Sequence, residues 1–212
     1  MTDFAILLGG ALVVTARLRR QIAGARVIAA DRGMAHAAAL GVVPELWVGD
    51  FDSAGSELTL HYRDIPRRMF PAEKDETDGS IAVAEAMARG ATRIVLVGGL
   101  GGQADHTVGI LGTALQLARR GVSCVVTSGG EEAWPVLSGE TLIDLPPHSR
   151  LSLIPFADLA GLDLEGVKWP LSGRDVPLGS TLTLSNIAHG AARISLRAGH
   201  GIAIAYPAHA DG

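Results

Sequence analysis

The sequence predicts an α/β N-terminal domain with a mainly parallel sheet, followed by an all-β, sandwich-like C-terminal domain. Short apolar runs alternate with segments of helical period over the first part of the chain, and no helical period survives beyond residue 140. We place the boundary after residue 136, which gives domains 1–136 and 137–212. The 212 residues, 48% of them hydrophobic, are enough to bury a large core.

The first domain is expected to contain buried parallel strands with helices on both faces of the sheet. Two helical segments end at glycines, DGSIAVAEAMARG at Gly90 and HTVGILGTALQLARRG at Gly121. Thr77 and Asp78 precede the first of them and suit its N-terminal cap. The runs typical of strands buried on both faces are FAILL, RVIAAD, ELWVGD, RIVLVGG and VSCVVTSGG.

The second domain is expected to be an antiparallel sandwich. Alternation is clearest in residues 193–197, where Ile194 and Leu196 fall on one face. Because this half is small for an independent core, we expect it to pack against the first domain or a second copy of itself. Its strand-like runs are ETLIDL, SRLSLIPF, STLTLSN, AARISLRAG and GIAIAYP.

Composition excludes several classes of protein. The net charge of −4 leaves no basic face for nucleic acid. The single cysteine, Cys124, lies in an apolar run, so no disulfide forms within the chain and a reducing, cytoplasmic location is expected. The segment from Phe4 to Val14 follows Asp3 and is interrupted by glycines, unlike a signal peptide, and no apolar run approaches the roughly 20 residues that cross a bilayer. We therefore expect no membrane partner.

Aspartates gather at the ends of the predicted strands and before the helices. Each could cap a turn or helix on its own, but the carboxyl ends of parallel strands meet at one edge of a sheet, where ligands bind. Several carboxylates there repel one another unless a cation neutralises them, and Mg²⁺ completed by substrate phosphates suits such ligands. The scattered histidines argue against zinc. The aspartates are Asp31, Asp50, Asp52, Asp75, Asp78 and Asp105.

A glycine-rich run, Gly98 to Gly102, follows a strand and precedes a helix, which lets backbone amides approach a phosphate. It also leaves two alternatives open. Gly99, Gly101 and Ala104 fit the looser GxGxxA pattern of a dinucleotide-binding oxidoreductase, although the acids then lack a role. A regulatory domain that only binds a nucleotide is the other alternative.

Motifs spread over nearly the whole chain resemble those of the thiamine pyrophosphokinase family. They are AADRG, GVVPELWVGDFDS, KDETD, GGLGGQADH, GVKWPL and LSN. The resemblance implies transfer of a diphosphoryl group from ATP to thiamine, giving thiamine diphosphate and AMP, with Mg²⁺ as cofactor. It also implies a homodimer with thiamine bound between subunits and the β domain at the interface.

The resemblance also implies roles for particular residues. Asp50, Asp52, Lys74, Asp75 and Asp78 form the catalytic group, in which Asp50, Asp52 and Asp75 hold the metal. Trp169, Ser185 and Asn186 bind thiamine. Judged alone, Lys74 could be a surface lysine and Trp169 a core residue, as Trp47 and Trp134 are expected to be. The nucleotide contacts are Asp31, Arg32, Ser53, Gly101, Gly102, Gln103, Asp105 and His106.

The sequence departs from the family pattern at three positions. Arg32 stands where a small residue is common, Gln103 where an arginine is usual, and Ile110 where an asparagine is usual. These differences concern the phosphate contacts. The carboxylates are unaffected.

Overall fold

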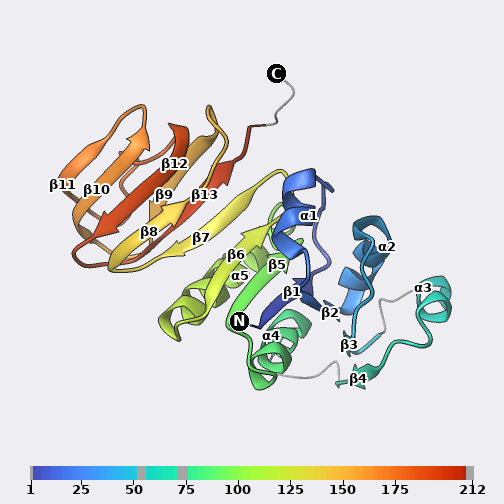
Figure 1. Cartoon of the computed structure of the whole chain (residues 1–212). Helices are drawn as coiled ribbons and strands as arrows, with labels where there is room; N and C mark the ends of the chain where they lie inside the picture. The colour runs from blue at the N-terminus through green and yellow to red at the C-terminus, as the bar shows by residue number, and fades with distance from the viewer. Residues whose placement is uncertain (1, 52–55, 71–75, 209–212) are drawn as a thin grey trace. The chain divides into compact units, whose positions relative to one another are not determined.

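The computed structural model describes residues 2–51, 56–70 and 76–208, and the chain divides into two compact units (Figure 1). One unit comprises residues up to 113 together with 121–129, and the other comprises 114–120 and the residues from 130 onward. The sequence-based boundary after residue 136 differs from this division, because β7 (Glu132–Val136) pairs with β13 (Gly201–Tyr206) in the second unit. The predicted fold class, α/β followed by β-rich, is confirmed.

The first unit is built on a parallel sheet with the strand order β6-β5-β1-β2-β3-β4. Successive strands after β1 extend the sheet to one side, whereas β5 and β6 extend it to the other. The direction therefore reverses between β1 and β5, the place where open parallel sheets bind ligands. The strands are β1 Asp3–Leu7, β2 Arg26–Ala30, β3 Leu46–Gly49, β4 Arg67–Met69, β5 Arg93–Val97 and β6 Ser123–Thr127.

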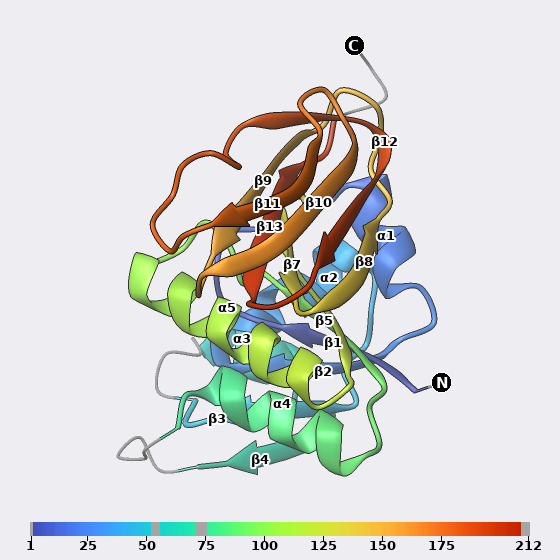
Figure 2. The same ribbon diagram turned by 90° about the vertical axis from the view of Figure 1, so that its left-hand side faces the viewer.

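Helices cover both faces of this sheet, with α4 and α5 on one face and α1 and α2 on the other (Figure 2). Within the described ranges, the helices include none that is both long and apolar enough to cross a membrane. A 3₁₀ turn, η1 (Asp31–Ala35), leads directly into α2. The helices are α1 Ala16–Ile22, α2 His36–Leu40, α3 Ser56–His61, α4 Asp78–Ala88 and α5 Ala104–Arg119.

The central strands are apolar on both faces, as the sequence predicts. Phe4 and Ile6 of β1 and Ile94 and Leu96 of β5 are fully buried, and burying each such side chain contributes about 1.5–3 kcal/mol. Cys124 of β6 is also buried, and desolvation raises the pKa of its thiol to about 12. The thiol therefore stays protonated near neutral pH, which makes it unreactive.

The second unit is an antiparallel β structure in which one long strand takes part in two sheets. Residues Asn186 and Ile187 of β12 pair with β9, whereas its later residues pair with β10 and β8. The predicted alternation is confirmed, since Ile194 and Leu196 are buried and Arg193 is exposed. The other strands are β8 Gly139–Ile143, β9 Arg150–Pro155, β10 Leu159–Val167, β11 Leu171–Val176 and β12 Asn186–Leu196.

One predicted strand is wrong. The STLTLSN run forms turns up to residue 185, and only Asn186 begins a strand. Leu182 and Leu184 are exposed, whereas Thr183 between them is buried, and its hydroxyl donates to the carbonyl of Leu153 at 2.5 Å. The alternation therefore does not mark an apolar face here.

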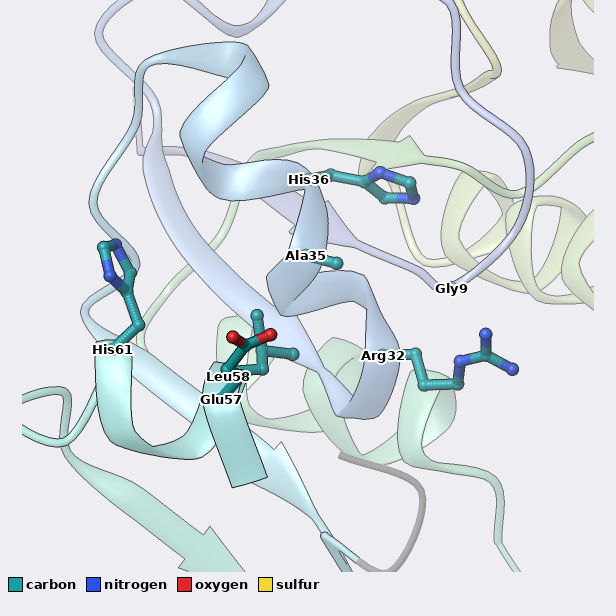
Figure 3. Close-up of a pocket in the computed structure, with 7 residues that line it drawn as sticks. All are labelled: Gly9, Arg32, Ala35, His36, Glu57, Leu58 and His61. Carbon is teal, nitrogen blue, oxygen red and sulfur yellow. The ribbon is translucent and has the colours of Figure 1, made fainter. Parts of the chain in front are cut away.

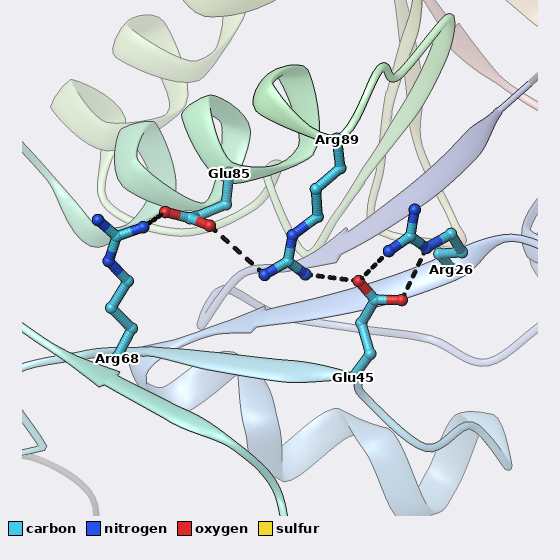
Figure 4. A network of polar contacts seen from close by, with 5 residues as sticks. All are labelled: Arg26, Glu45, Arg68, Glu85 and Arg89. Carbon is cyan, nitrogen blue, oxygen red and sulfur yellow. Dashed lines mark hydrogen bonds and ion pairs between the residues drawn. The ribbon is translucent and has the colours of Figure 1, made fainter.

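A chain of alternating charges ties β2, β3 and β4 to α4 (Figure 4). Glu45, just before β3, accepts two hydrogen bonds from Arg26 at 2.8 and 2.7 Å and one from Arg89 at 2.5 Å. Glu85 of α4 pairs with both Arg89 and Arg68 of β4. The bond from Arg26 is the largest cause that lowers the pKa of Glu45, and Arg89 adds to it. The network fixes α4 against the edge of the sheet.

The edge strand β4 has little apolar burial. Each of its residues is exposed, and Arg67 is held by its side chain instead. Its guanidinium donates to the carbonyl oxygen of Thr59 at 2.6 Å and lies 5.1 Å from the ring centre of Trp47. Contacts of arginine therefore take the place of a hydrophobic face.

Replacing Glu45 with Gln is expected to lower the free energy of unfolding at pH 7 by about 1 kcal/mol. This loss corresponds to a fall in the melting temperature of roughly 2–4 °C. Because the pKa of Glu45 is lower in the folded state, its contribution to stability is complete above the unfolded-state pKa. That contribution is lost as the pH falls through the folded-state pKa. Thermal melts of both proteins should therefore converge as the pH falls below the ordinary pKa of a glutamate and through the lowered folded-state pKa of Glu45. The control is Glu140→Gln, which removes a more exposed pair with Arg193. An equal loss in both variants would contradict the role of the network.

Candidate active site

A cleft of about 700 Å³ opens at the carboxyl-terminal edge of the parallel sheet, within the first unit. The loops after β1, β2, β3 and β5 meet there with the first turns of α4 and α5, which is the position expected at the reversal of strand order. Its lining residues are Leu8, Gly9, Gly10, Ala11, Ala30, Asp31, Arg32, Asp50, Glu76, Thr77, Asp78, Gly79, Gly98, Gly99, Gly102, Gln103, His106, Thr107 and Ile110.

Glycines allow the loops after β1 and β5 to touch backbone to backbone. A Cβ atom on Gly10 would lie 2.3 Å from the carbonyl oxygen of Gly98. A Cβ atom on Gly98, where φ is 78°, would lie 2.5 Å from the carbonyl oxygen of Leu8. Any side chain at either position would separate the two loops. The glycine-rich run predicted from the sequence therefore shapes the floor of the cleft.

Three of the predicted aspartates line this cleft. Asp31 follows β2, Asp50 follows β3, and Asp78 begins α4. The structure thus brings together acids that lie far apart in the sequence. The other predicted members of the GDFDS and KDETD motifs lie outside the described residues, namely Asp52, Ser53, Lys74 and Asp75.

The backbone at Asp31 is held in an uncommon conformation. Its φ of 42° lies in the left-handed region, which costs a non-glycine residue free energy unless the surroundings impose it. The indole Nε1 of Trp47 donates to the carbonyl oxygen of Asp31 at 2.9 Å. Gly49 lies so close that a Cβ atom there would be 3.3 Å from the Cα of Asp31. The end of β3 therefore determines where Asp31 stands.

The first turn of α4 supplies another part of the wall. Thr77 is its N-cap and accepts a hydrogen bond from the backbone amide of Ser80 at 3.2 Å, which confirms the capping prediction. Asp78 occupies the first turn, where the helix dipole favours a negative charge. The capped helix holds Asp78 at the cleft.

The start of α5 contributes some of the predicted nucleotide contacts to the lining of the cleft. Gly102, Gln103 and His106 line the cleft. Gly101 and Asp105 are not among the lining residues, and the carboxylate of Asp105 accepts a hydrogen bond from the amide of His106 at 2.8 Å. Asp105 therefore accepts a hydrogen bond from a backbone amide in the first turn of its own helix, where the helix dipole favours a negative charge.

A second cavity of about 680 Å³ adjoins the first and shares Gly9 and Arg32 with it (Figure 3). The side chains of Arg32 and His36 extend toward the side of the cavity on which Gly9 lies, and Nε2 of His36 is 2.9 Å from the carbonyl oxygen of Gly10. Arg32 therefore borders both cavities, and its exposed guanidinium can reach a ligand in either. The remaining lining residues are Ala35, Glu57, Leu58 and His61.

The predicted thiamine residues belong to the second unit. Trp169 is 54% exposed, and the Nζ atom of Lys168 lies 4.6 Å from the centre of its ring. The Asn186 amide is buried, accepts from the amide of Trp169 at 3.1 Å and donates to its carbonyl oxygen at 2.8 Å. Ser185 has a φ of 59°, and its amide donates to the hydroxyl of Ser152 at 2.9 Å. Asn186 thus holds Trp169 in place and presents its ring to solvent.

Sequence reasoning missed several residues of the cleft. Thr107 directly follows the GGLGGQADH motif, so a wider motif boundary would have included it. Glu76 lies inside the KDETD motif but was assigned no role there. Trp47 contacts the site through its indole nitrogen, although an apolar run suggested packing alone. No pattern in the sequence distinguishes such a tryptophan from an ordinary core residue.

Within the described residues no group of three or more His, Cys, Asp and Glu side chains is close enough to hold a metal ion. The donors that line the cleft are nevertheless carboxylates, the hard oxygen ligands that suit Mg²⁺. This ion commonly needs only one or two protein carboxylates, since water and substrate phosphates complete its shell. The donor set of the cleft therefore fits magnesium held jointly with a polyphosphate.

An open parallel sheet with an acidic, glycine-rich cleft at its point of reversal defines an enzyme of the nucleotide-binding α/β class. The model for the catalytic domain of thiamin pyrophosphokinase matches residues 22–126. The model for its vitamin B1 binding domain matches residues 140–200. The chain therefore belongs to the thiamine pyrophosphokinase family, as the motifs predict.

Individual relatives agree with this assignment. The thiamine pyrophosphokinase of Bacillus subtilis is 29% identical over 163 residues, covering 75% of this chain and 76% of that protein. A crystal structure of the B. subtilis enzyme has a TM-score of 0.85 at 26% identity and covers 98% of this chain and 100% of its own. The thiamin pyrophosphokinase of Geobacillus thermodenitrificans has a TM-score of 0.81 at 27% identity, covering 100% and 99%. The oxidoreductase alternative finds no support in these similarities.

Proposed function

We propose that the chain transfers the diphosphoryl group of ATP to the hydroxyl group of thiamine, giving thiamine diphosphate and AMP, in the cleft of the first unit. The observation that carries this proposal is the convergence of Asp31, Asp50 and Asp78 beside the glycine-rich loop, in a chain of this family. The hydroxyl oxygen attacks the β-phosphorus, the bond to the α-phosphate oxygen breaks, and AMP leaves. Such a transfer depends chiefly on alignment and on neutralising phosphate charge.

Magnesium is the expected cation, held by Asp50 together with Asp52 and Asp75, the latter two lying outside the described residues. When bound, it would neutralise charge on the phosphate oxygens. Lys74, also outside the described residues, would add a positive charge to the same group. The repulsion between the clustered carboxylates supports this assignment, because a polyanionic substrate could not otherwise approach them.

The proton of the thiamine hydroxyl needs an acceptor. Asp75 and Asp78 are the candidates, and the structure describes Asp78 at the first turn of α4, lining the cleft. A carboxylate that is not bound to the metal can accept this proton as the new bond forms. Gly102, Gln103 and Arg32 would contact the phosphates, while Asp105, which accepts a hydrogen bond from the amide of His106, would stabilise the first turn of α5.

The second unit would bind thiamine. Its exposed Trp169 offers an aromatic face to a cationic, aromatic ligand, an attraction of about 0.5–2 kcal/mol. Lys168 lies over the Trp169 ring, so the ligand would use the other face. Asn186 would contribute mainly by fixing Trp169, and Ser185 would contact the pyrimidine ring.

The same unit would form a homodimer interface. It carries large apolar side chains that solvent reaches, and such patches commonly mark protein contacts. Sedimentation at micromolar protein is expected to give a dimer, and an active monomer would contradict the proposal. The exposed apolar residues are Leu142, Trp169, Leu178, Leu182, Leu184 and Tyr206.

We place the enzyme in the cytoplasm. The support for this is chemical, since its single cysteine is buried and protonated and forms no disulfide.

The activity is tested by incubating the protein with ATP, Mg²⁺ and thiamine and separating the products. Thiamine diphosphate with an equal amount of AMP is the expected result. Thiamine monophosphate with ADP would show simple phosphoryl transfer, and NAD(P)-dependent oxidation without AMP would favour an oxidoreductase. Nucleotide binding without turnover would favour the regulatory alternative.

Asp50→Asn is expected to lower kcat/KM by about a hundredfold or more, because it removes a charged group that organises the transferred phosphates. Asp52→Asn should act alike, and a chelator should abolish activity of the unmodified enzyme. Folding should survive, since removing one charge relieves repulsion among carboxylates. The measurement pairs steady-state kinetics with a thermal melt, and full activity in EDTA would contradict the assignment.

Trp169→Ala is expected to raise the KM for thiamine by roughly 2–30-fold, the equivalent of one cation-π contact. The KM for ATP and kcat should change little, because stacking acts equally on the bound substrate and the transition state. Trp134→Ala in β7 serves as a control for losing a tryptophan from the same unit. A change in both KM values would show that Trp169 only supports the fold.

Arg32 and Gln103 line the same cleft. Arg32 would therefore supply the positive charge that the family usually carries at position 103. Arg32→Gly should raise the KM for ATP by about 10–150-fold, the range for a charge-assisted hydrogen bond. Adding Gln103→Arg should restore most of that loss. Additive effects in this double-mutant cycle would show that the positions act separately.

A further inference from the structure

The indole of Trp47 contacts two loops of the cleft, although its place in β3 is that of a core residue. The side chain is fully buried. Its Nε1 donates to the carbonyl oxygen of Asp31 at 2.9 Å, and its ring meets the ring of Phe51 edge to face, with the centres 4.9 Å apart. One residue of β3 therefore touches both loops that carry Asp31 and Asp50.

Both contacted residues have a backbone conformation that L-residues rarely adopt. The φ angle is 42° at Asp31 and 63° at Phe51, which directly follows Asp50. Such conformations persist only where the surroundings impose them, and they cluster at functional sites. The contacts of Trp47 fall on these two residues, so the indole is placed to maintain the two turns that direct the acids.

The indole is itself held from several sides. The backbone amide of Trp47 donates to the carbonyl oxygen of Pro66 at 2.9 Å, and the ring centres of Trp47 and Tyr62 are 6.5 Å apart. The guanidinium of Arg67 lies 5.1 Å from the ring centre of Trp47 and 5.6 Å from that of Phe51. The ring therefore acts as a fixed donor.

Packing alone would not require a tryptophan here. A phenylalanine or leucine would supply apolar surface, whereas a buried N–H must find an acceptor. That acceptor is a backbone oxygen of a residue lining the cleft. The bond consequently acts on the orientation of Asp31.

We infer that Trp47 is a positioning residue for ATP: its indole N–H fixes the backbone of Asp31 so that the carboxylate faces the nucleotide cleft. The inference rests on the cleft being the ATP site proposed above. Trp47 does not touch the substrate in this account, and the effect of its N–H passes through Asp31. Its ring contact with Phe51 is a separate interaction that another aromatic ring at position 47 can retain.

The test measures the binding of ATP with Mg²⁺ by calorimetry in a double-mutant cycle. Trp47→Phe keeps an aromatic ring but removes the N–H. Asp31→Asn removes the carboxylate charge, and asparagine tolerates the positive φ at this position. Trp134→Phe, the same change at a half-buried tryptophan of the second unit, is the matched control. The affinity of each variant for thiamine is measured in parallel, and it should not change if only the positioning of ATP is lost.

Trp47→Phe is expected to weaken ATP binding by about three- to tenfold relative to Trp134→Phe, as for one hydrogen bond. In the Asp31→Asn background the same change should have no further effect. Additive losses, equal losses in both tryptophan variants, or an Asp31→Asn protein that binds ATP normally would each overturn the inference. Failure to form thiamine diphosphate would instead overturn the proposed reaction, because ATP binding is measured without turnover.

A second variant addresses the case in which Trp47→Phe does not fold. Gly49→Ala would place a Cβ atom 3.3 Å from the Cα of Asp31, at a residue whose φ of 156° is strained for alanine, so it disturbs the contact between the end of β3 and Asp31 while the indole N–H is retained. ATP binding should weaken by at least about threefold, again only where Asp31 carries its carboxylate. Unchanged binding would show that the position of Asp31 has no influence on the nucleotide.

Discussion

The cleft depends on a single topological constraint, the reversal of strand order between β1 and β5. Because the chain leaves these adjacent parallel strands toward opposite faces of the sheet, their loops separate and leave a cleft at the carboxyl edge. The glycines of both loops let the backbones touch at the base of that cleft. The acids then need only stand at the ends of neighbouring strands to converge.

The central strands and the aspartate motifs could be predicted because they combine strong patterns. The apolar runs of β1, β2, β3, β5 and β6 have no polar face, and their ends carry Asp or Gly. Elements with weak patterns were not predicted. The α1 segment is rich in arginine, β4 is exposed throughout, and β10 and β11 carry many polar residues. Their stability comes from contacts with distant parts of the chain, which a local pattern does not contain.

The candidate site shows the same division between type and geometry. The sequence identifies the kind of group, since Asp31, Asp50 and Asp78 are all carboxylates that line the cleft. It does not reveal that the side chain of Asp105 bonds to its own helix, because the direction of a carboxylate depends on the local backbone. Nor does it reveal the polar contact of Trp47, since an acceptor supplied by the chain fold has no signature in residue order.

The open edge of the first sheet has a consequence for how copies of the protein meet. A strand with unpaired backbone groups invites another strand to add to it, which leads to aggregation. β4 is only three residues long and carries Arg67 and Arg68, whose charges would repel the same edge on a neighbouring molecule. Their contacts with Trp47 and Glu85 fix these charges in place. The shortness of β4 and its two arginines therefore disfavour the addition of a strand from another molecule at this edge.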